Sequence, residues 1–540
     1  EKYGPSSIYI TKVTPGPRGD IYDRNGRKLV TNIRKYNFWI DGKNIADKEK
    51  IIKLFSNTFG RDESIYIDLI AKGKRYLEKN VEETDARAIL SEINNIKGLY
   101  KDTVYTRHYP YHDLCSQVFG YLDSNSKPKS GLESYFNEVL RGDSITTKYV
   151  RDNFGAIRIY DEEMPLTKLF ANNENKIKRG LDLTLTIDID VQSIFQNELQ
   201  KAVNESNAVS ANGIIVDPLS GEIIAMATVP SNNLNNRIDF KIENSINRAI
   251  SDQYEPGSTF KIFPVSAILE LDIYSPSDSF DCENGKLDIS DIYKLPKRRI
   301  VQDHDPYDTL SIVGIISNSS NIGMSKIVSA LPDMELYKYT KMFGFGEKHG
   351  INLPFEGKGV IHHPRSSKWY KESKPIVSIG QSITSTSLQM AIAYSAIANN
   401  GKIMKPKIIK NLKDKNTGII KNIENEVVRD MLSDATAENI RKMLYDVVEN
   451  GTAKNVKMKS IKIGGKTGTA QKANNGKYSD NEFISSFASI FPIDNPQFVC
   501  IVSIDSPDKG KHWGNETAAP VVKKTVSRML KENKIRLWLR

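Results

Sequence analysis

Apolar segments with strand periodicity lie near the beginning and near the end of the longer, C-terminal part of the chain. Two of the early ones, Gly213–Val216 and Ile223–Ala227, flank the turn signal Asp217–Gly221 and therefore predict a β-hairpin. The predicted strands are residues 181–187, 213–216, 223–227, 460–464, 483–491 and 498–504. Because helical patterns lie between them, we expect an α+β domain whose first and last strands meet in one antiparallel sheet.

Helical patterns fill much of the interval between these strands. Residues 189–203 and 520–533 are predicted to be helices, and the largely apolar run Ile262–Leu271 predicts a buried one. The turn signal Pro256–Gly257 precedes this buried helix and places Ser258 in its first turn.

The N-terminal third has a different character from the rest of the chain. It contains short mixed segments and charge-rich helical stretches such as residues 82–96, and no catalytic set of residues stands out in it. The polar stretch at residues 172–179 is the predicted boundary. We therefore expect a non-catalytic domain at residues 1–180 and a catalytic domain at residues 181–540.

Composition and charge limit the classes of partner. The hydrophobic content of 39% and charged content of 26% are ordinary for a globular protein, and the net charge of +10 favours an anionic polymer or lipid surface. The basic residues are spread along the chain without a nucleic-acid module, so we expect no nucleic-acid partner. The three cysteines are far apart and odd in number, so no disulfide framework is predicted, and Cys500 lies in an apolar strand pattern typical of burial.

Ser258 and Lys261 carry the strongest candidate chemistry. Residues three apart share a helix face, so we expect the Ser258 hydroxyl and the Lys261 amine to meet. A serine hydroxyl is a weak nucleophile unless a base takes its proton, and lysine can be that base only if burial or nearby cations depress its pKa. The spacing alone is weak, because it recurs at Ser124, Ser126 and Ser506.

Two further motifs follow along the chain and give this pair a context. Ser319-Ser320-Asn321 comes after an apolar run, although such a triplet is more often a helix cap or a turn. Lys466-Thr467-Gly468-Thr469 occurs after a predicted strand. On an edge strand, its lysine charge and two threonine hydroxyls can hold a carboxylate, and its glycine permits close approach of another backbone.

In this order, the three motifs resemble those of the penicillin-binding proteins and the serine β-lactamases. The similarity to class B penicillin-binding proteins is wider and runs from about residue 16 to about residue 525. Gly16–Gly26 and Gly131–Glu133 resemble two boxes of their N-terminal pedestal. Stretches that resemble their transpeptidase domain are Phe343–Gly346, Ser378–Gln381 and Gly451–Ala453. Glu255–Phe263 resembles the cell-division subgroup most closely.

The resemblance implies a fold, a location and partners. The fold is a penicillin-binding transpeptidase domain, an antiparallel sheet flanked by helices, preceded by an elongated mixed α/β pedestal of the dimerisation type. No run here approaches 18 apolar residues, so the implied single membrane anchor would lie before this chain, with the chain on the extracytoplasmic side of the cell membrane. The implied partners are peptidoglycan stem peptides, β-lactams, a glycosyltransferase and division proteins.

The implied activity is a D,D-transpeptidase that cross-links stem peptides in septal wall synthesis, without a metal or an organic cofactor. Ser258, Lys261 and Ser319 would act as nucleophile, base and proton relay. The substrate-binding residues would be Asn321, Lys466, Thr467, Gly468 and Thr469. The backbone N–H groups of Ser258 and Thr469 would form the oxyanion hole.

Two rival functions and one metal site are the alternatives to this expectation. A serine β-lactamase or β-lactam sensor is a rival because Ser258-Thr-Phe-Lys261 also resembles class D β-lactamases, but the long N-terminal part and Ser-Ser-Asn disfavour it. An idle scaffold acting through residues 1–180 is disfavoured by the intact motifs. Asp303-His304-Asp305 follows Cys282 without the usual spacing of metal ligands.

Overall fold

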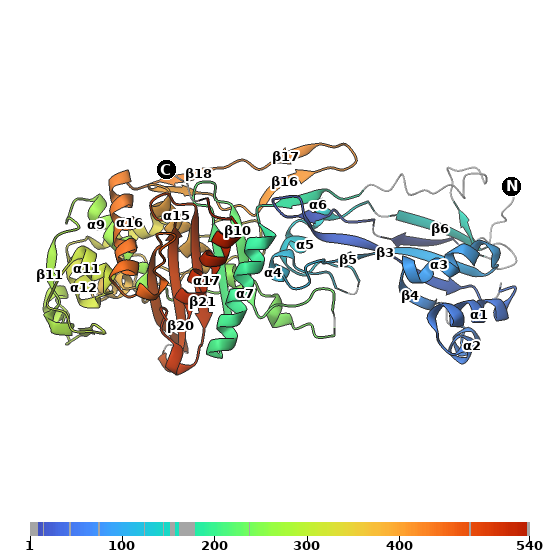
Figure 1. The fold of residues 1–540 in the computed structure, drawn as a ribbon, viewed down its shortest axis with the longest axis horizontal. Coiled ribbons are helices and arrows are strands. Elements are labelled where there is room, and N and C mark those ends of the chain that lie inside the picture. Colours follow the sequence, from blue (N-terminus) through green and yellow to red (C-terminus); the bar gives the residue numbers. More distant parts are fainter. Residues whose placement is uncertain are drawn as a thin grey trace.

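The computed structural model of the protein is elongated, with the N-terminal part at one end and the predicted catalytic part at the other (Figure 1). It describes residues 9–14, 16–42, 45–73, 76–123, 125–143, 145–151, 157–160, 179–236, 238–474 and 477–536. A large hydrophobic core lies around the C-terminal sheet, and a smaller core lies in the N-terminal part. In the described residues, no helix has the length and apolar character needed to cross a membrane.

The C-terminal part is built on an antiparallel sheet in the order β10-β9-β21-β20-β19. Its strands are β9 (Ser210–Val216), β10 (Ile223–Val229), β19 (Gly464–Asn474), β20 (Lys477–Phe491) and β21 (Phe498–Asp505). The β9–β10 hairpin forms as predicted, and its strand β9 pairs with β21 near the end of the chain. The predicted α+β class is therefore confirmed, and the early hairpin and the late strands share one sheet. The first predicted strand, at residues 181–187, does not join them and forms β8 (Asp182–Leu185) in another sheet.

Helices cover both faces of this sheet (Figure 1). The two predicted helices α7 (Ile189–Ser206) and α17 (Ala518–Lys531) pack against each other and against the sheet. On the other face lies α15 (Ser387–Ala398), in which every residue is buried, as expected for a helix that is apolar on all sides. Beside α15, α16 (Asp434–Glu449) packs against β19, and α9 (Ile262–Glu270), the predicted buried helix, packs against α16.

The far end of the molecule is formed by the N-terminal part. The long strand β3 (Lys28–Ile40) pairs with β4 (Tyr76–Glu82) and with β5 (Leu99–His108). Helices α1 (Lys48–Phe59), α2 (Glu63–Ala71) and α3 (Glu83–Glu92) lie beside these strands. The helical pattern at residues 82–96 is thus confirmed as α3 and the short 3₁₀ turn that follows it.

One sheet runs across the predicted domain boundary. Strand β2 (Ile21–Tyr22) pairs in parallel with β8 (Asp182–Leu185), which also pairs with β16 (Ile409–Lys413). Most of the predicted boundary stretch, residues 172–178, lies outside the described residues. The division at residue 180 stays a prediction, and the main chain on its two sides shares hydrogen bonds.

The two N-terminal boxes noted in the sequence meet through a buried ion cluster. Arg18 Nε lies 2.8 Å from Glu133 Oε2, and Arg107 Nη2 lies 2.6 Å from Glu133 Oε1. The Glu133 side chain is fully buried, and those of Arg18 and Arg107 are 11% and 4% exposed. Gly19 stands where a Cβ atom would come within 1.8 Å of Leu181 O, so only glycine fits there. These contacts tie the first box to both the second box and the start of the catalytic part.

Two predicted positions are wrong. The strand predicted at residues 460–464 begins only at Gly464, because its ladder partner β20 ends at Phe491 and is followed by Pro492, which has no N–H to donate. Ser258 lies in a 3₁₀ turn, Gly257–Phe260, that leads into α9, not in the first turn of α9 itself. The prediction for Cys500 is confirmed, since it is buried in β21, and burial raises the pKa of its thiol.

Candidate active site

The turn that carries Ser258 is fixed on both sides by buried hydrogen bonds. Gly257 has φ +55°, a left-handed conformation that favours glycine, and its N–H donates to Gly380 O at 3.0 Å. The Tyr394 hydroxyl, from the buried helix α15, donates to Thr259 O at 2.8 Å. Ser258 itself is half-buried, and within the described part of the chain its hydroxyl makes no hydrogen bond. The turn therefore presents this hydroxyl in a fixed position with its bonding capacity unused.

Lys261 is fully buried next to the Ser-Ser-Asn motif. Its Nζ donates to Ser319 O at 2.6 Å, to Ser319 Oγ at 3.3 Å and to Asn321 Oδ1 at 2.7 Å. The expected direct hydrogen bond between Ser258 and Lys261 is not formed among the described residues. Burial lowers the pKa of Lys261 to about 7, while the Asp303 carboxylate acts in the opposite direction. A lysine in this state can exchange a proton near neutral pH.

The Ser-Ser-Asn motif is held by a carboxylate that the sequence analysis did not single out for this role. Asp303 accepts hydrogen bonds from Ser320 Oγ at 2.5 Å, from the Asn321 N–H at 2.5 Å and from the Ile322 N–H at 3.0 Å. It thereby caps the N-terminus of α12 (Asn321–Ser329). Ser319, just before the cap, has φ +60°, an uncommon conformation for a residue with a Cβ atom.

The Lys-Thr-Gly-Thr motif lies on β19, at the edge of the sheet, as predicted. Lys466 is fully buried, and burial together with the positive charge of Lys261 lowers its pKa well below the ordinary value. Thr467 Oγ1 lies 3.1 Å from the hydroxyl of Thr452, which belongs to the Gly-Thr-Ala stretch noted in the sequence. Thr469 Oγ1 accepts from the Gly514 N–H at 3.1 Å.

Gly468 brings β19 against the serine turn. A Cβ atom at Gly468 would lie 2.6 Å from Ser486 Oγ and 2.9 Å from Pro256 O, so no larger residue fits without a shift of the backbone. Beside it, a Cβ atom on Gly257 would be 3.4 Å from Thr469 O. The serine turn and the motif strand thus lie in van der Waals contact. This close approach accounts for glycine at 468, whereas glycine at 257 is accounted for by its positive φ.

The loop that contains Asp303 and the segment that binds the motif strand at Gly514 also contact each other. The ring of His304, next to Asp303, packs edge-on against Trp513 with 5.0 Å between ring centroids. Trp513 precedes Gly514, whose N–H is bonded to the motif strand. In the described part of the chain, no three His, Cys, Asp or Glu side chains are grouped to hold a metal ion.

The structure therefore gathers the three motifs around one point. The Ser258 turn forms the base, Lys261 contacts Ser319 and Asn321 on one side, and Lys466 lies on the edge strand within electrostatic reach of Lys261. A serine hydroxyl that no described residue hydrogen-bonds, one turn along the chain from a lysine of lowered pKa, is the arrangement of a serine acyltransferase with a lysine base. Sequence reasoning missed Asp303, Thr452 and Trp513 in this setting, because each reaches the site from a loop far from the motifs.

Comparison with known proteins agrees with this class. Residues 212–527 match the family Penicillin binding protein transpeptidase domain, and residues 13–167 match the Penicillin-binding Protein dimerisation domain. Stage V sporulation protein D of Bacillus subtilis is 30% identical over 94% of this chain and 76% of its own length. The Peptidoglycan D,D-transpeptidase FtsI homolog of Mesostigma viride is 30% identical over 96% of this chain and 88% of its own length. This chain therefore belongs to the class B penicillin-binding proteins.

Solved structures share its fold. Penicillin Binding Protein 2X from Streptococcus thermophilus aligns with a TM-score of 0.79 at 22% identity, covering 97% of this chain and 81% of that chain. Penicillin binding protein 3 from Mycobacterium tuberculosis, complexed with aztreonam, aligns with a TM-score of 0.72 at 24% identity, covering 98% of each chain. The expected order of an N-terminal pedestal and a transpeptidase domain is confirmed.

Proposed function

We propose that Ser258 performs the acyl transfer by which this peptidoglycan D,D-transpeptidase cross-links stem peptides. Ser258 Oγ attacks the carbonyl carbon between two terminal D-alanines, and the C–N bond to the last D-alanine breaks. An amine of a neighbouring stem peptide then attacks the resulting ester, forms the cross-link and releases Ser258. Dividing the exchange into two steps lowers each barrier. The observation that carries the proposal is the Ser258 hydroxyl, without a hydrogen bond to any described residue, in a fixed turn that leads to a buried lysine of lowered pKa.

In this proposal, Lys261 takes the Ser258 proton and Ser319 carries a proton to the leaving amine. The lowered pKa of Lys261 and the 3.3 Å contact of its Nζ with Ser319 Oγ support these roles. The N–H groups of Ser258 and Thr469 would stabilise the oxyanion. The close approach of the serine turn to the motif strand at Gly257 supports this pairing.

The donor peptide would be held by Asn321 and the motif strand. Lys466 would bind the terminal carboxylate together with Thr467 and Thr469, while Gly468 allows the strand to reach the serine turn. Burial and the charge of Lys261 disfavour the charged form of Lys466 in the free enzyme, and an arriving carboxylate would restore it. β-Lactams carry the same carboxylate and would acylate Ser258.

The finer biological assignment is also a proposal. We assign the chain to septal wall synthesis, next to a glycosyltransferase and division proteins, because its serine motif resembles the cell-division subgroup. The site would lie outside the cytoplasm on a protein with one N-terminal membrane anchor. Residues 1–180 would be the non-catalytic pedestal and residues 181–540 the catalytic domain.

The direct test of the activity uses a synthetic stem peptide that ends in D-Ala-D-Ala, with and without an added amine acceptor. The proposal expects release of one D-alanine per acyl transfer and a new amide-linked product that appears only with the acceptor. D-Alanine release that is unchanged by the acceptor, with no amide product, would indicate a hydrolase instead. No release by protein that still binds a fluorescent penicillin would contradict the assigned substrate.

A further inference from the structure

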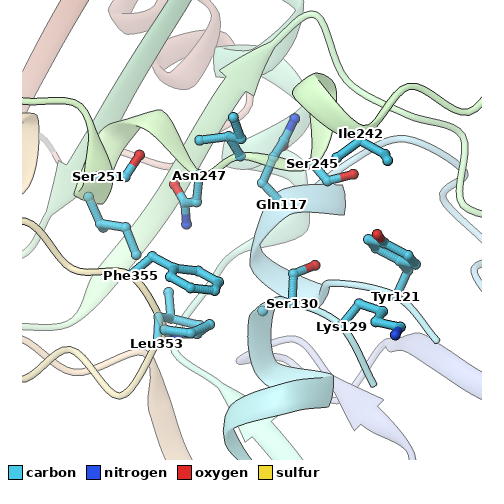
Figure 2. A pocket seen from close by; sticks show the side chains of 14 residues that line it. Gln117, Tyr121, Lys129, Ser130, Ile242, Ser245, Asn247, Ser251, Leu353 and Phe355 are labelled. Atoms are coloured by element: carbon cyan, nitrogen blue, oxygen red, sulfur yellow. The ribbon is translucent and has the colours of Figure 1, made fainter. Parts of the chain in front are cut away.

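A cavity lies where the pedestal meets the transpeptidase domain, apart from the motif residues (Figure 2). Its volume is about 340 Å³. One wall comes from residues 117–131 and the other from residues 242–251 and 353–355. Figure 2 shows Phe355 and Leu353 on one side and Tyr121 and Lys129 on the other. Mostly apolar concave sites at domain junctions, with a few polar groups, are typical binding sites.

The walls are held in place by hydrogen bonds across the junction. Gln117 Nε2 donates to Thr228 O at 3.1 Å and to Asn244 O at 2.8 Å. Asn352 Nδ2 donates to the Tyr135 hydroxyl at 3.2 Å. The cavity is therefore preformed, so an occupant would not have to order its walls on binding.

Phe355 combines an exposed aromatic side chain with an unfavourable backbone conformation. Its side chain is 76% exposed, and its backbone has φ +67°, which is unfavourable for a residue with a large side chain. The buried Glu356 carboxylate holds the loop before it by accepting the N–H groups of His349 at 2.5 Å and Gly350 at 3.0 Å. A strained conformation that exposes an aromatic ring indicates a function for that ring.

Two further apolar side chains extend the rim. Ile242 is 73% exposed and Ile246 is 41% exposed, and both line the cavity with Phe355. Exposed apolar side chains grouped around a pocket mark protein interaction sites, where a partner inserts an anchor side chain. Such a set differs from single exposed apolar residues, which are ordinary on protein surfaces.

The polar groups that line the cavity indicate which residue stands next to the anchor side chain in the partner segment. Lys129 is the charged residue of the lining, and its ion pair with Asp123 at 3.2 Å is solvent-exposed and easily exchanged. Ser130 Oγ is buried and has no hydrogen-bond partner among the described residues. The lining thus offers apolar area, one cation and one unused hydroxyl, and complements an apolar side chain next to a carboxylate.

We propose that this junction cavity is a docking site for a partner protein segment that inserts one large apolar side chain beside Phe355 and places an acidic residue at Lys129. The occupant contacts both sides of the junction, so its binding couples the pedestal to the transpeptidase domain. The proposal concerns a surface separate from the motif residues and adds a partner contact to the function proposed above.

The test uses blocked dipeptides as defined probes and ligand-observed saturation-transfer NMR on the whole chain. The proposal expects N-acetyl-Phe-Glu-amide to bind with a Kd of about 1–10 mM and N-acetyl-Phe-Lys-amide and N-acetyl-Ala-Glu-amide to bind about tenfold more weakly or not at all, a factor that corresponds to about 1.4 kcal/mol. Phe355→Ser should remove binding of the first probe. Ile419→Ser is the matched control, because Ile419 is also exposed, at 67%, but does not line the cavity.

Reversing the charge of Lys129 tests whether this residue binds the acidic residue of the probe. Lys129→Glu should exchange the preference, so that the Phe-Lys probe binds better than the Phe-Glu probe. Equal binding of both probes to the original protein, or the same loss in Ile419→Ser as in Phe355→Ser, would overturn the proposal. Binding of decanoate alone would indicate a lipid site, and a concentration-dependent dimer lost in Phe355→Ser would indicate a second copy of the chain. β-Lactam acylation should be unchanged in all these variants, so failure here is separate from failure of the catalytic assignment.

Discussion

At the scale of single residues, the surroundings of Lys261 define what its amine can do. A neutral amine has two N–H donors and one lone pair. The two shortest contacts of Nζ, to Ser319 O at 2.6 Å and to Asn321 Oδ1 at 2.7 Å, use both donors. The lone pair is then left for a proton from Ser258 or Ser319. The sequence predicted the residues of this site from their motifs, but it could not predict these contacts, because they depend on a turn about 60 residues further along the chain.

The first prediction concerns pH. Because burial lowers the pKa of Lys261 to about 7, the second-order acylation rate with a penicillin should rise as pH increases through about 7 and then level off. The neutral form is the base, so the low-pH side is the inactive one. Stopped-flow acylation measured from pH 5.5 to 9 checks this. In Lys261→Arg the rate should fall by about 10²–10⁴ and lose this rise, since arginine keeps its proton.

The second prediction separates Lys466 from proton transfer. A charge-assisted hydrogen bond contributes about 1.5–3 kcal/mol, so Lys466→Ala should slow acylation by a carboxylate-bearing β-lactam by about ten- to more than a hundredfold. An analogue with an esterified carboxylate should be affected much less, because the anchor then has no anion to hold. Lys261→Ala should slow both about equally. The same loss for acid and ester in Lys466→Ala would assign Lys466 to proton transfer or to site structure instead.

At the scale of elements, most strands and helices follow from periodicity, and the failures have local causes. The strand predicted at 460–464 has the right alternation, but its neighbour β20 ends at Phe491 and the regular pairing stops at Gly464, although the Ile493 N–H still donates to Lys462 O at 2.9 Å. A helix cap is one reading of Ser-Ser-Asn, and Ser320 is the N-cap of α12, but the Asp303 carboxylate that also binds the helix start lies 18 residues earlier in a loop. A sequence pattern indicates which backbone and side-chain groups need a hydrogen-bond partner. Which residue becomes that partner depends on the tertiary fold.

The third prediction tests Asp303 as a positioning residue. The Asp303 charge keeps the pKa of Lys261 higher than burial alone would, so Asp303→Asn should move the midpoint of the acylation pH profile to lower pH. It should also lower Tm, because the neutral amide keeps an acceptor oxygen but loses the charge that interacts with the helix N-terminus, a contribution of about 0.3–1 kcal/mol. Asp305→Asn is the control, since Asp305 is 61% exposed and should change neither quantity. A lower Tm with an unmoved midpoint would mean that Asp303 supports α12 only.

At the scale of the whole molecule, the sequence predicts the two-part organisation but not the hydrogen bonds and ion pairs that join the parts. The pedestal and transpeptidase sequences were recognised from their boxes, whereas the parallel pairing of β2 with β8 joins residues about 160 positions apart. The buried cluster of Arg18, Arg107 and Glu133 also depends on three separate segments. Such long-range pairings leave no periodic signal in a single sequence.

The fourth prediction concerns that buried cluster. Glu133→Gln leaves two nearly buried guanidinium groups without their carboxylate, and breaking a buried pair costs about 3–5 kcal/mol. Thermal unfolding should show a clearly lower Tm, with the β-lactam acylation rate of the folded protein unchanged. Glu138→Gln is the control, because its pair with Arg141 is exposed and contributes about 0–1 kcal/mol. Equal shifts in Tm for the two variants would show that the cluster does not stabilise the pedestal.

The central claim is that Ser258 is the acylated nucleophile, and intact-protein mass spectrometry after exposure to a penicillin tests it most directly. The account predicts one covalent adduct per chain, mapped by peptide digestion to the segment that contains Ser258, persisting through the experiment and absent in Ser258→Ala. Ser319→Ala is the matched control within the site and should still form the adduct, more slowly. A stoichiometric adduct on Ser258→Ala, or an adduct on another residue, would contradict the account. Rapid loss of the adduct from the original protein would instead make the chain a β-lactamase.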